Sequence, residues 1–151
     1  MKTICFAGLT SETNLGDIVI IESTKGLYKE ALKGKGNFKT SDLNLQFTNL
    51  SFSYRAIRKL KRLFYSFFSS DSSHLEVSLL KKHYKKQMKN ADLLVLVGGG
   101  LIKYKYQSFF LYLTALIEVA KELNIPLVIN AAGVEGYDEN DARCQLLKDS
   151  L

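Results

Sequence analysis

Several chemistries are excluded by residues that the sequence has in short supply. Its 151 residues include two cysteines, Cys5 and Cys144, and two histidines, His74 and His83. Because Cys5 falls in a predicted buried strand, we expect no disulfide framework and a reducing, cytoplasmic compartment. The four residues have none of the paired spacings of a Cys/His zinc site, so we expect no metal centre.

Long apolar runs are also lacking. The first one, within Met1–Gly8, is too short for the core of a secretory signal peptide. The longest candidate, Phe109–Ala120, is interrupted by Thr114 and Glu118, and it falls short of the ~20 apolar residues of a membrane span. With 46% hydrophobic and 24% charged residues, the chain has the composition of one soluble globular domain.

Short apolar runs do occur, and they alternate with helical patterns. The runs Thr3–Ala7, Asp92–Val97 and Leu127–Ala131 predict buried parallel strands, and a further strand is predicted over Leu43–Phe47. Between them, apolar residues spaced three or four apart predict helices. The predicted helices span Asp17 to about Lys33, about Tyr54 to Phe68, the residues after the polar break Ser69–Ser73 to about Asn90, Gln107–Leu123, and about Glu139 to the end. The side chains expected to face the core are Ile18, Ile21, Leu32, Val77, Leu80, Tyr84, Met88, Phe109, Leu113, Leu116, Ile117 and Ala120.

This alternation predicts the α/β class, with a Rossmann-like parallel sheet flanked by helices. In such sheets the ligand crevice lies outside the carboxyl ends of the strands. Three predicted loops occupy that edge: Gly8–Asp17, Gly98–Tyr106 and Ala131–Asp138. We therefore expect the functional site among them.

The first loop contains Asn14-Leu15-Gly16-Asp17. Gly16 allows close approach of the backbone to a ligand or a positive φ, Asn14 can bind a ligand hydroxyl, and Asp17 suits the first turn of a helix. A capped turn without any ligand explains the same residues. The loop is not a dinucleotide fingerprint or a P-loop, because G-x-G-x-x-G and Gly-Lys-Ser/Thr are both absent.

The second loop opens with the glycine run Gly98-Gly99-Gly100. Exposed backbone N–H groups there could cradle an anion, and Lys103 would add positive charge. Tyr106 and Gln107 add stacking surface and hydrogen-bonding groups. Tight packing of strand on helix, with the lysine in solvent, is the alternative explanation.

The third loop, Gly133–Asp138, combines two glycines with acidic side chains. Glu135 could act as a base or hold a sugar hydroxyl. An ordinary surface loop has the same composition, and no residue of the sequence can be singled out as catalytic.

Positive charge is concentrated in the middle of the chain. Between Arg55 and Lys89 ten Lys or Arg oppose two acids, so this segment carries +8 although the whole chain carries +6. Basic helices with an apolar face suit an anionic membrane surface. Two core-packing helices with a solvated basic face are the more common explanation of this pattern, and no motif for nucleic-acid recognition accompanies the charge.

In this order, three motifs resemble the polysaccharide pyruvyl transferase family over about Lys2–Leu151. Asn-x-Gly-Asp follows the first strand in TNLGDIVI, a strand led by Ala-Asp ends in glycines in ADLLVLVGGGLI, and a strand led by Pro ends in a glycine turn in PLVINAAGVEGYD. The third motif departs from the family, which often has Gly-Pro where this chain has Gly136-Tyr137.

The resemblance implies transfer of the enolpyruvyl carbons of phosphoenolpyruvate to two sugar hydroxyls, forming a cyclic ketal and releasing phosphate. It implies no cofactor beyond this donor. Acceptors would be cell-wall or exopolysaccharide precursors on lipid or nucleotide carriers, in the cytoplasm or at the inner membrane surface.

The family's plan has two Rossmann-like halves arranged as in GT-B glycosyltransferases. Residues 1–151 would be the N-terminal half, inactive alone, with the donor-binding basic residues in a missing half; a final helix that ends without a cap fits this view. Asn14, Gly16, Asp17 and the glycine run Gly98-Gly99-Gly100 would line the cleft. Candidates from their chemistry alone are Lys103, Tyr106, Gln107, Gly133 and Glu135.

Two other functions stay open. A GT-B glycosyltransferase that uses a nucleotide sugar shares the two-domain plan. A stand-alone flavodoxin-like binding domain would be non-enzymatic and would hold a flavin phosphate through Thr10, Ser11 and Thr13. An apolar interdomain face would also let the isolated domain form a homodimer.

Overall fold

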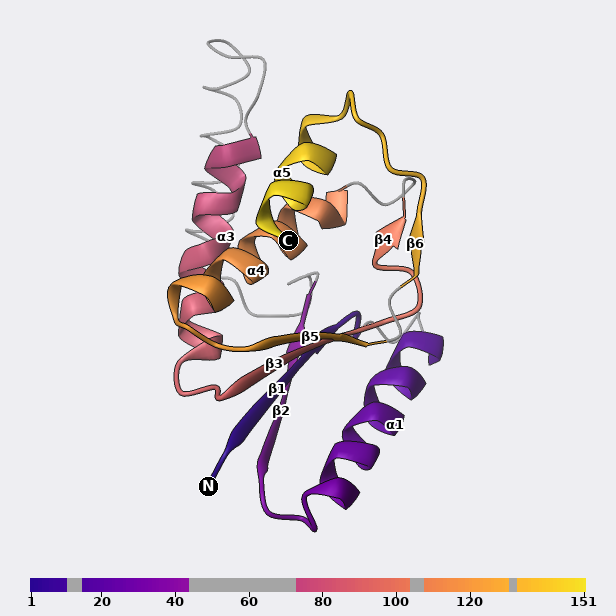
Figure 1. Ribbon diagram of the computed structural model, residues 1–151, viewed down its shortest axis with the longest axis vertical. Coiled ribbons are helices and arrows are strands. Elements are labelled where there is room, and N and C mark those ends of the chain that lie inside the picture. Colours follow the sequence, from indigo (N-terminus) through magenta and orange to yellow (C-terminus); the bar gives the residue numbers. More distant parts are fainter. Residues whose placement is uncertain (11–14, 44–72, 104–107, 131–132) are drawn as a thin grey trace.

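The main sheet is parallel and has four strands (Figure 1). The computed structural model describes residues 1–10, 15–43, 73–103, 108–130 and 133–151. The strands are β1 (Thr3–Gly8), β2 (Asn37–Asp42), β3 (Leu93–Val97) and β5 (Leu127–Asn130), in the order β2-β1-β3-β5. The α/β class with a Rossmann-like parallel sheet is therefore confirmed.

Helices cover both faces of this sheet (Figure 1). Helix α1 (Leu15–Ala31) lies on one face, and α3 (Ser73–Met88), α4 (Ser108–Glu122) and α5 (Ala142–Ser150) lie on the other. Because successive side chains of a strand point to opposite faces, β1 divides its residues between two cores. Ile4 and Phe6 belong to the cluster that contains Ile21 of α1, whereas Cys5 and Ala7 belong to the larger cluster with α3 and α4.

Most predicted core positions of α3 and α4 are confirmed. Val77, Leu80, Tyr84 and Met88 are all buried in α3, and the Tyr84 hydroxyl donates a 2.7 Å hydrogen bond to the carbonyl of Leu43. In α4 the predicted set Leu113, Leu116, Ile117 and Ala120 is buried. The fully buried aromatic ring of α4 belongs to Phe110, however, and the predicted Phe109 is only half-buried.

The strand predicted at Leu43–Phe47 is wrong at its start, because the strand in this part of the chain is β2 and Leu43 lies in the turn after it. Strand β2 lies at the sheet edge and buries only Ser41. Its sequence, NFKTSD, therefore lacks the apolar run on which the prediction relied. Residues 44–47 and the helix predicted over Tyr54–Phe68 lie outside the described residues.

Two further predictions fail at the periphery. Strand β5 was expected to be buried, but Val128 is 39% exposed and Ile129 is 43% exposed. Among the described residues β5 is the other edge of the sheet, and β3 is its one pairing partner there. Leu32, expected on the apolar face of α1, lies beyond the end of that helix and is 38% exposed. No helix in the described ranges is long and apolar enough to cross a membrane.

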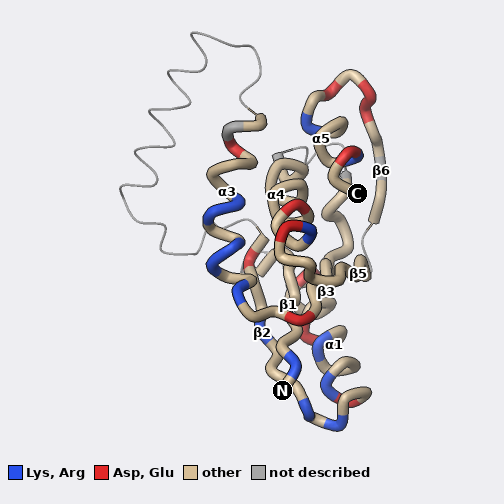
Figure 2. The backbone as a smooth tube through the Cα atoms, turned by 60° about the vertical axis from the view of Figure 1, so that its left-hand side comes forward, with Lys and Arg blue, Asp and Glu red and all other residues tan. Residues whose placement is uncertain are grey.

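An ion-pair cluster joins α3 to α4, two neighbouring helices that carry blue and red segments in Figure 2. Lys81 Nζ lies 2.6 Å from Glu118 Oε2 and 2.5 Å from Glu122 Oε1, and Lys85 Nζ lies 2.6 Å from Glu122 Oε2. These pairs are partly solvated, so each stabilises the fold by no more than about 1 kcal/mol. They do neutralise two lysines of the basic segment, which reduces the cationic face that α3 offers to a membrane.

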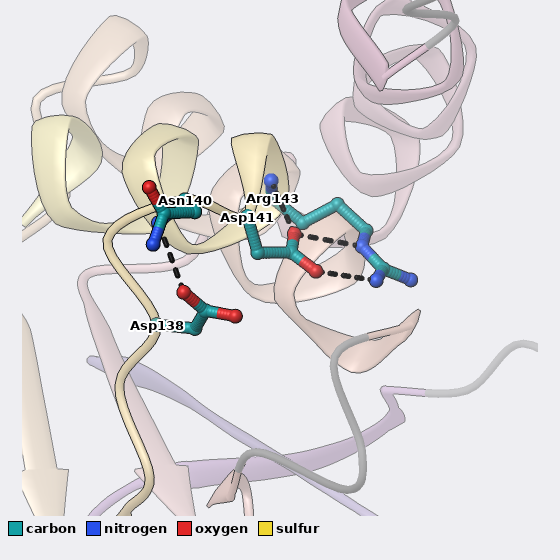
Figure 3. Close-up of polar contacts among 4 residues, drawn as sticks. All are labelled: Asp138, Asn140, Asp141 and Arg143. Atoms are coloured by element: carbon teal, nitrogen blue, oxygen red, sulfur yellow. Dashed lines mark hydrogen bonds and ion pairs between the residues drawn. The ribbon is translucent and has the colours of Figure 1, made fainter.

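Helix α5 begins at Ala142, not at the predicted Glu139, because two aspartates build its entrance (Figure 3). Asp138 Oδ1 accepts the backbone N–H of Asn140 at 2.9 Å. Asp141 is the N-cap, and its Oδ1 accepts the backbone N–H of Arg143 at 2.8 Å. The helix runs to Ser150, and the backbone N–H of Leu151 donates to the carbonyls of Leu147 and Lys148.

Two glycines, one crowded between β1, β3 and α1 and one open on α1, predict opposite effects of Gly→Ala substitutions on stability. A Cβ at Gly8 would lie 2.3 Å from the carbonyl oxygen of Val97, whereas one at Gly26 of α1 would meet nothing within 4 Å. Gly8→Ala should lower the free energy of unfolding by about 3 kcal/mol, and Gly26→Ala should raise it by roughly 0.5–1 kcal/mol. Urea unfolding followed by circular dichroism measures both, and an unchanged midpoint for Gly8→Ala would contradict the packing described.

The cap of α5 predicts a pH-dependent contribution to stability. The bonded Arg143 side chain lowers the pKa of the Asp141 carboxyl below its ordinary value of 3.8. A carboxylate with a depressed native pKa stabilises the fold fully above its unfolded pKa and loses that effect as pH falls through its native pKa. Asp141→Ala should therefore cost about 1 kcal/mol at pH 7, and the difference from the unsubstituted protein should vanish in acid.

Thermal unfolding between pH 7 and pH 2 tests this expectation. Asp149→Ala serves as the control, because Asp149 is exposed in the last turn of the same helix, where an acid faces the negative helix end. A loss at Asp141→Ala that stayed constant down to pH 2 would contradict the proposed role of the carboxylate.

Candidate functional site at the carboxyl edge of the sheet

The strand order sets the position of the candidate site. The chain leaves β1 for β2 on one side, and β3 then adds to the other side of β1. In a doubly wound sheet the ligand crevice opens where the connections diverge in this way, outside the carboxyl ends of the two central strands. Those ends are Gly8 of β1 and Val97 of β3.

A buried carboxylate joins the first two loops at this point. Asp17, in the first turn of α1, is 8% exposed, and its Oδ1 accepts the backbone N–H of Gly99 at 3.0 Å. The positive end of the helix attracts a carboxylate in this position. Asp17 therefore holds the glycine run against α1, across 82 positions of sequence.

The glycine run is shaped by close packing as well as by its position. Gly98 is buried with φ +155°, and a Cβ there would lie 3.0 Å from Cγ of Leu101. Gly99 is exposed, and a Cβ on it would meet only ordinary contacts. Because Asp17 occupies the N–H of Gly99, that group is not available to the anion cradle suggested by the sequence.

The third loop is connected to the second by a short ribbon absent from the sequence-based prediction. Strand β4 (Ile102–Lys103) pairs in parallel with β6 (Val134–Glu135). The backbone N–H of Ile102 also donates to the carbonyl of Gly133 at 3.2 Å. In Figure 1 this ribbon lies near the start of α1. The three predicted loops are therefore neighbours at one edge.

The predicted residues that the structure describes lie at this edge. Gly16 is exposed in the first turn of α1, and Lys103 faces Glu135 in the register of β4 and β6. The side chains of Lys103 and Glu135, and the whole of Asn14, Tyr106 and Gln107, lie outside the described residues. Their assignment to the site stays a prediction.

Two polar residues of the same edge were missed by the sequence analysis. Asp42 ends β2, and its Oδ1 accepts the backbone N–H of Thr10 at 3.3 Å. At the end of β5, the Asn130 amide donates to Thr24 Oγ1 of α1 at 3.4 Å. An acid directly after a strand would have been the signal for Asp42, but the polar strand β2 was not recognised.

A cavity opens between α4, α5 and the β4–β6 ribbon. It has a volume of about 410 Å³ and is walled largely by apolar side chains, among them Phe110, Val134 and Leu147. Lys148 is the charged residue of its lining, and its Nζ lies 5.9 Å from the centre of the Tyr137 ring. A sugar or a small anion needs several polar partners, which this largely apolar wall does not provide.

The described side chains offer neither a reactive thiol nor a cluster of metal ligands. Burial raises the pKa of the Cys5 thiol to about 11, so Cys5 is protonated and inert near neutral pH. Cys5 and Cys144 are both free. No group of three or more His, Cys, Asp or Glu side chains in the described ranges is placed to hold a metal ion. The chemistry available at the edge is that of carboxylates, hydroxyls and backbone amides.

Comparison with known proteins identifies the family. The family model for polysaccharide pyruvyl transferase matches residues 14–151. No curated protein and no solved structure is significantly similar to the chain. The family match covers the Asn14–Asp17 motif, the glycine run and the third loop, the same segments that meet at the carboxyl edge. The chain therefore belongs to the polysaccharide pyruvyl transferase family.

Proposed function

We propose that this protein takes part in the transfer of pyruvate from phosphoenolpyruvate to a pair of sugar hydroxyls, in the synthesis of a cell-wall or exopolysaccharide glycan. The reaction joins both hydroxyl oxygens to C2 of the donor and breaks the bond from C2 to the phosphate oxygen. One hydroxyl proton balances the new methyl group at C3, and the other leaves with phosphate. The family match is the observation that carries the proposal.

The carboxyl edge is assigned to the acceptor sugar in this proposal. Its described polar side chains include Asp17, Asp42 and Asn130, which are two acids and an amide. Carboxylates attract hydroxyl donors and repel the phosphate and carboxylate of phosphoenolpyruvate. Donor binding then falls to basic groups elsewhere, which agrees with a two-domain enzyme whose second half supplies them.

The same charge argues against a flavin phosphate in the first loop. Thr10 was one of the hydroxyl residues that could have held it, yet its backbone N–H is donated to the Asp42 carboxylate. An acid at this distance repels a phosphate dianion. No described contact favours a nucleotide sugar over phosphoenolpyruvate as the donor, so we retain a single proposed function.

An assay of phosphate release tests the proposal directly. The product of the complete open reading frame and the 151-residue chain are each incubated with phosphoenolpyruvate and a panel of glycan acceptors. We expect acceptor-dependent phosphate release from the complete product and none from the 151-residue chain alone. A complete product that ignores phosphoenolpyruvate and consumes a nucleotide sugar would replace this proposal with a glycosyltransferase.

Two substitutions of Asp17 separate a positioning role from a direct one. Asp17→Asn keeps an oxygen that can accept the N–H of Gly99, whereas Asp17→Ala leaves this N–H without a partner. If Asp17 only positions the glycine run, kcat/KM for the acceptor should fall about 100-fold in Asp17→Ala and less than about tenfold in Asp17→Asn.

The comparison needs a control on the same helix. Glu22→Gln changes a carboxylate of α1 that is 59% exposed and pairs with Lys25, and it should leave kcat/KM unchanged. Equal losses in Asp17→Asn and Asp17→Ala would contradict the positioning role, because they would mean that the negative charge itself acts on the reactants.

A further inference from the structure

One carboxylate of the carboxyl edge is held in place but only half satisfied. Asp42 stands opposite Gly8 in the register of β2 and β1, and the next residue, Leu43, donates its backbone N–H to the carbonyl of Gly8 at 2.8 Å. Leu43 is fully buried, and its carbonyl accepts the Tyr84 hydroxyl. The backbone on both sides of the Asp42 carboxylate is thus fixed by packing and hydrogen bonds.

The two oxygens of this carboxylate differ. Oδ1 accepts the backbone N–H of Thr10 at 3.3 Å. Oδ2 is shielded from solvent and has no hydrogen-bond partner among the residues that the structure describes. Burying a carboxylate oxygen away from both water and a hydrogen-bond donor lowers the stability of the folded protein. Most buried polar atoms in folded proteins have a hydrogen-bond partner, so this unpaired oxygen needs an explanation. A missing ligand donor provides one.

The position of Asp42 indicates what that donor is. In doubly wound sheets, an acid on the strand beside the first strand accepts hydrogen bonds from a pair of ribose hydroxyls, at the same edge where the first loop binds the rest of the ligand. Asp42 has this place: it ends β2, beside β1, and it touches the first loop at Thr10. A cation fits less well, because Asp42 belongs to no group of three or more His, Cys, Asp or Glu side chains in the described ranges that could hold a metal ion.

We propose that the Asp42 carboxylate is a subsite for two adjacent hydroxyl groups of the ligand. This inference deepens the proposed function, on which it rests for the nature of the acceptor. The diol can come from the acceptor sugar itself or from the ribose of a nucleotide that carries it. The chemistry is the same in both cases: two O–H donors reach one carboxylate whose second oxygen lacks a partner.

Nuclear magnetic resonance titration tests the subsite without the transfer reaction. In the ¹⁵N-labelled chain, the backbone amide of Thr10 reports on its bonded carboxylate. The sugar arm uses the methyl glycosides of glucose, galactose and mannose, each compared with its fully O-methylated form, which cannot donate. The ribose arm compares uridine monophosphate with its 2′,3′-dideoxy form. We expect the Thr10 amide to shift with the hydroxylated member of at least one arm and not with its blocked partner.

Asp42→Asn provides the protein side of the test, and Asp92→Asn is the matched control. Asp92 also accepts a strand N–H, that of Thr3 at 2.7 Å, but at the amino edge of the same sheet. We expect Asp42→Asn to weaken binding of the hydroxylated probe by about tenfold or more and Asp92→Asn to leave it unchanged.

The outcomes separate this inference from the proposed function. Diol-dependent binding through Asp42 supports the subsite even if the complete product fails to use phosphoenolpyruvate, and the responding arm identifies the source of the diol. Equal shifts with hydroxylated and blocked probes, no shift in either arm, or unchanged affinity in Asp42→Asn would overturn it. The probe comparison on the unsubstituted chain stays decisive if Asp42→Asn fails to fold.

Discussion

The burial of β1 on both faces is the constraint on which the rest of the structure depends. All six of its residues are shielded from solvent, and it pairs with β2 on one side and β3 on the other. A strand enclosed in this way needs helices above and below it, which α1 supplies on one face and α3 with α4 on the other. The same packing places Gly8 so close to Val97 and Ile21 that a side chain at position 8 would not fit. The switch point of the sheet, and hence the candidate site, follows from this central position.

At the carboxyl edge two aspartates have different roles, and the difference comes from their partners. Asp17 is used inside the protein, since its Oδ1 holds the N–H of Gly99 at a helix N-terminus. Asp42 is anchored through one oxygen, and the other has no partner in the described part of the chain. A buried group with satisfied hydrogen bonds stabilises local geometry, whereas an unsatisfied one is most readily explained by function. This contrast is why we assign Asp17 to positioning and Asp42 to ligand binding.

The fold was predictable where burial left a local trace in the sequence. Strands β1 and β3, and the inner faces of α3 and α4, follow from apolar periodicity alone, because their neighbours enclose them. The edge strands were predicted less well. Strand β2 is polar and was not recognised, and β5 was predicted to be buried although Val128 and Ile129 are partly exposed. Edge strands receive their structure from a backbone pairing partner and not from burial of their own side chains, so periodicity carries little information about them.

By itself, then, the sequence determined the α/β class, the three glycine-containing loops and their resemblance to polysaccharide pyruvyl transferases. These features lie in contiguous motifs, where spacing and residue type are enough. Only the tertiary structure decided that Asp17 bonds to Gly99, that β4 pairs with β6, and that Asp42 shares the edge with one oxygen unpartnered. The hydrogen bonds of Asp17 and Asp42 join residues 82 and 32 positions apart. Contacts at such separations are fixed by how strands align in the sheet, which no local pattern encodes.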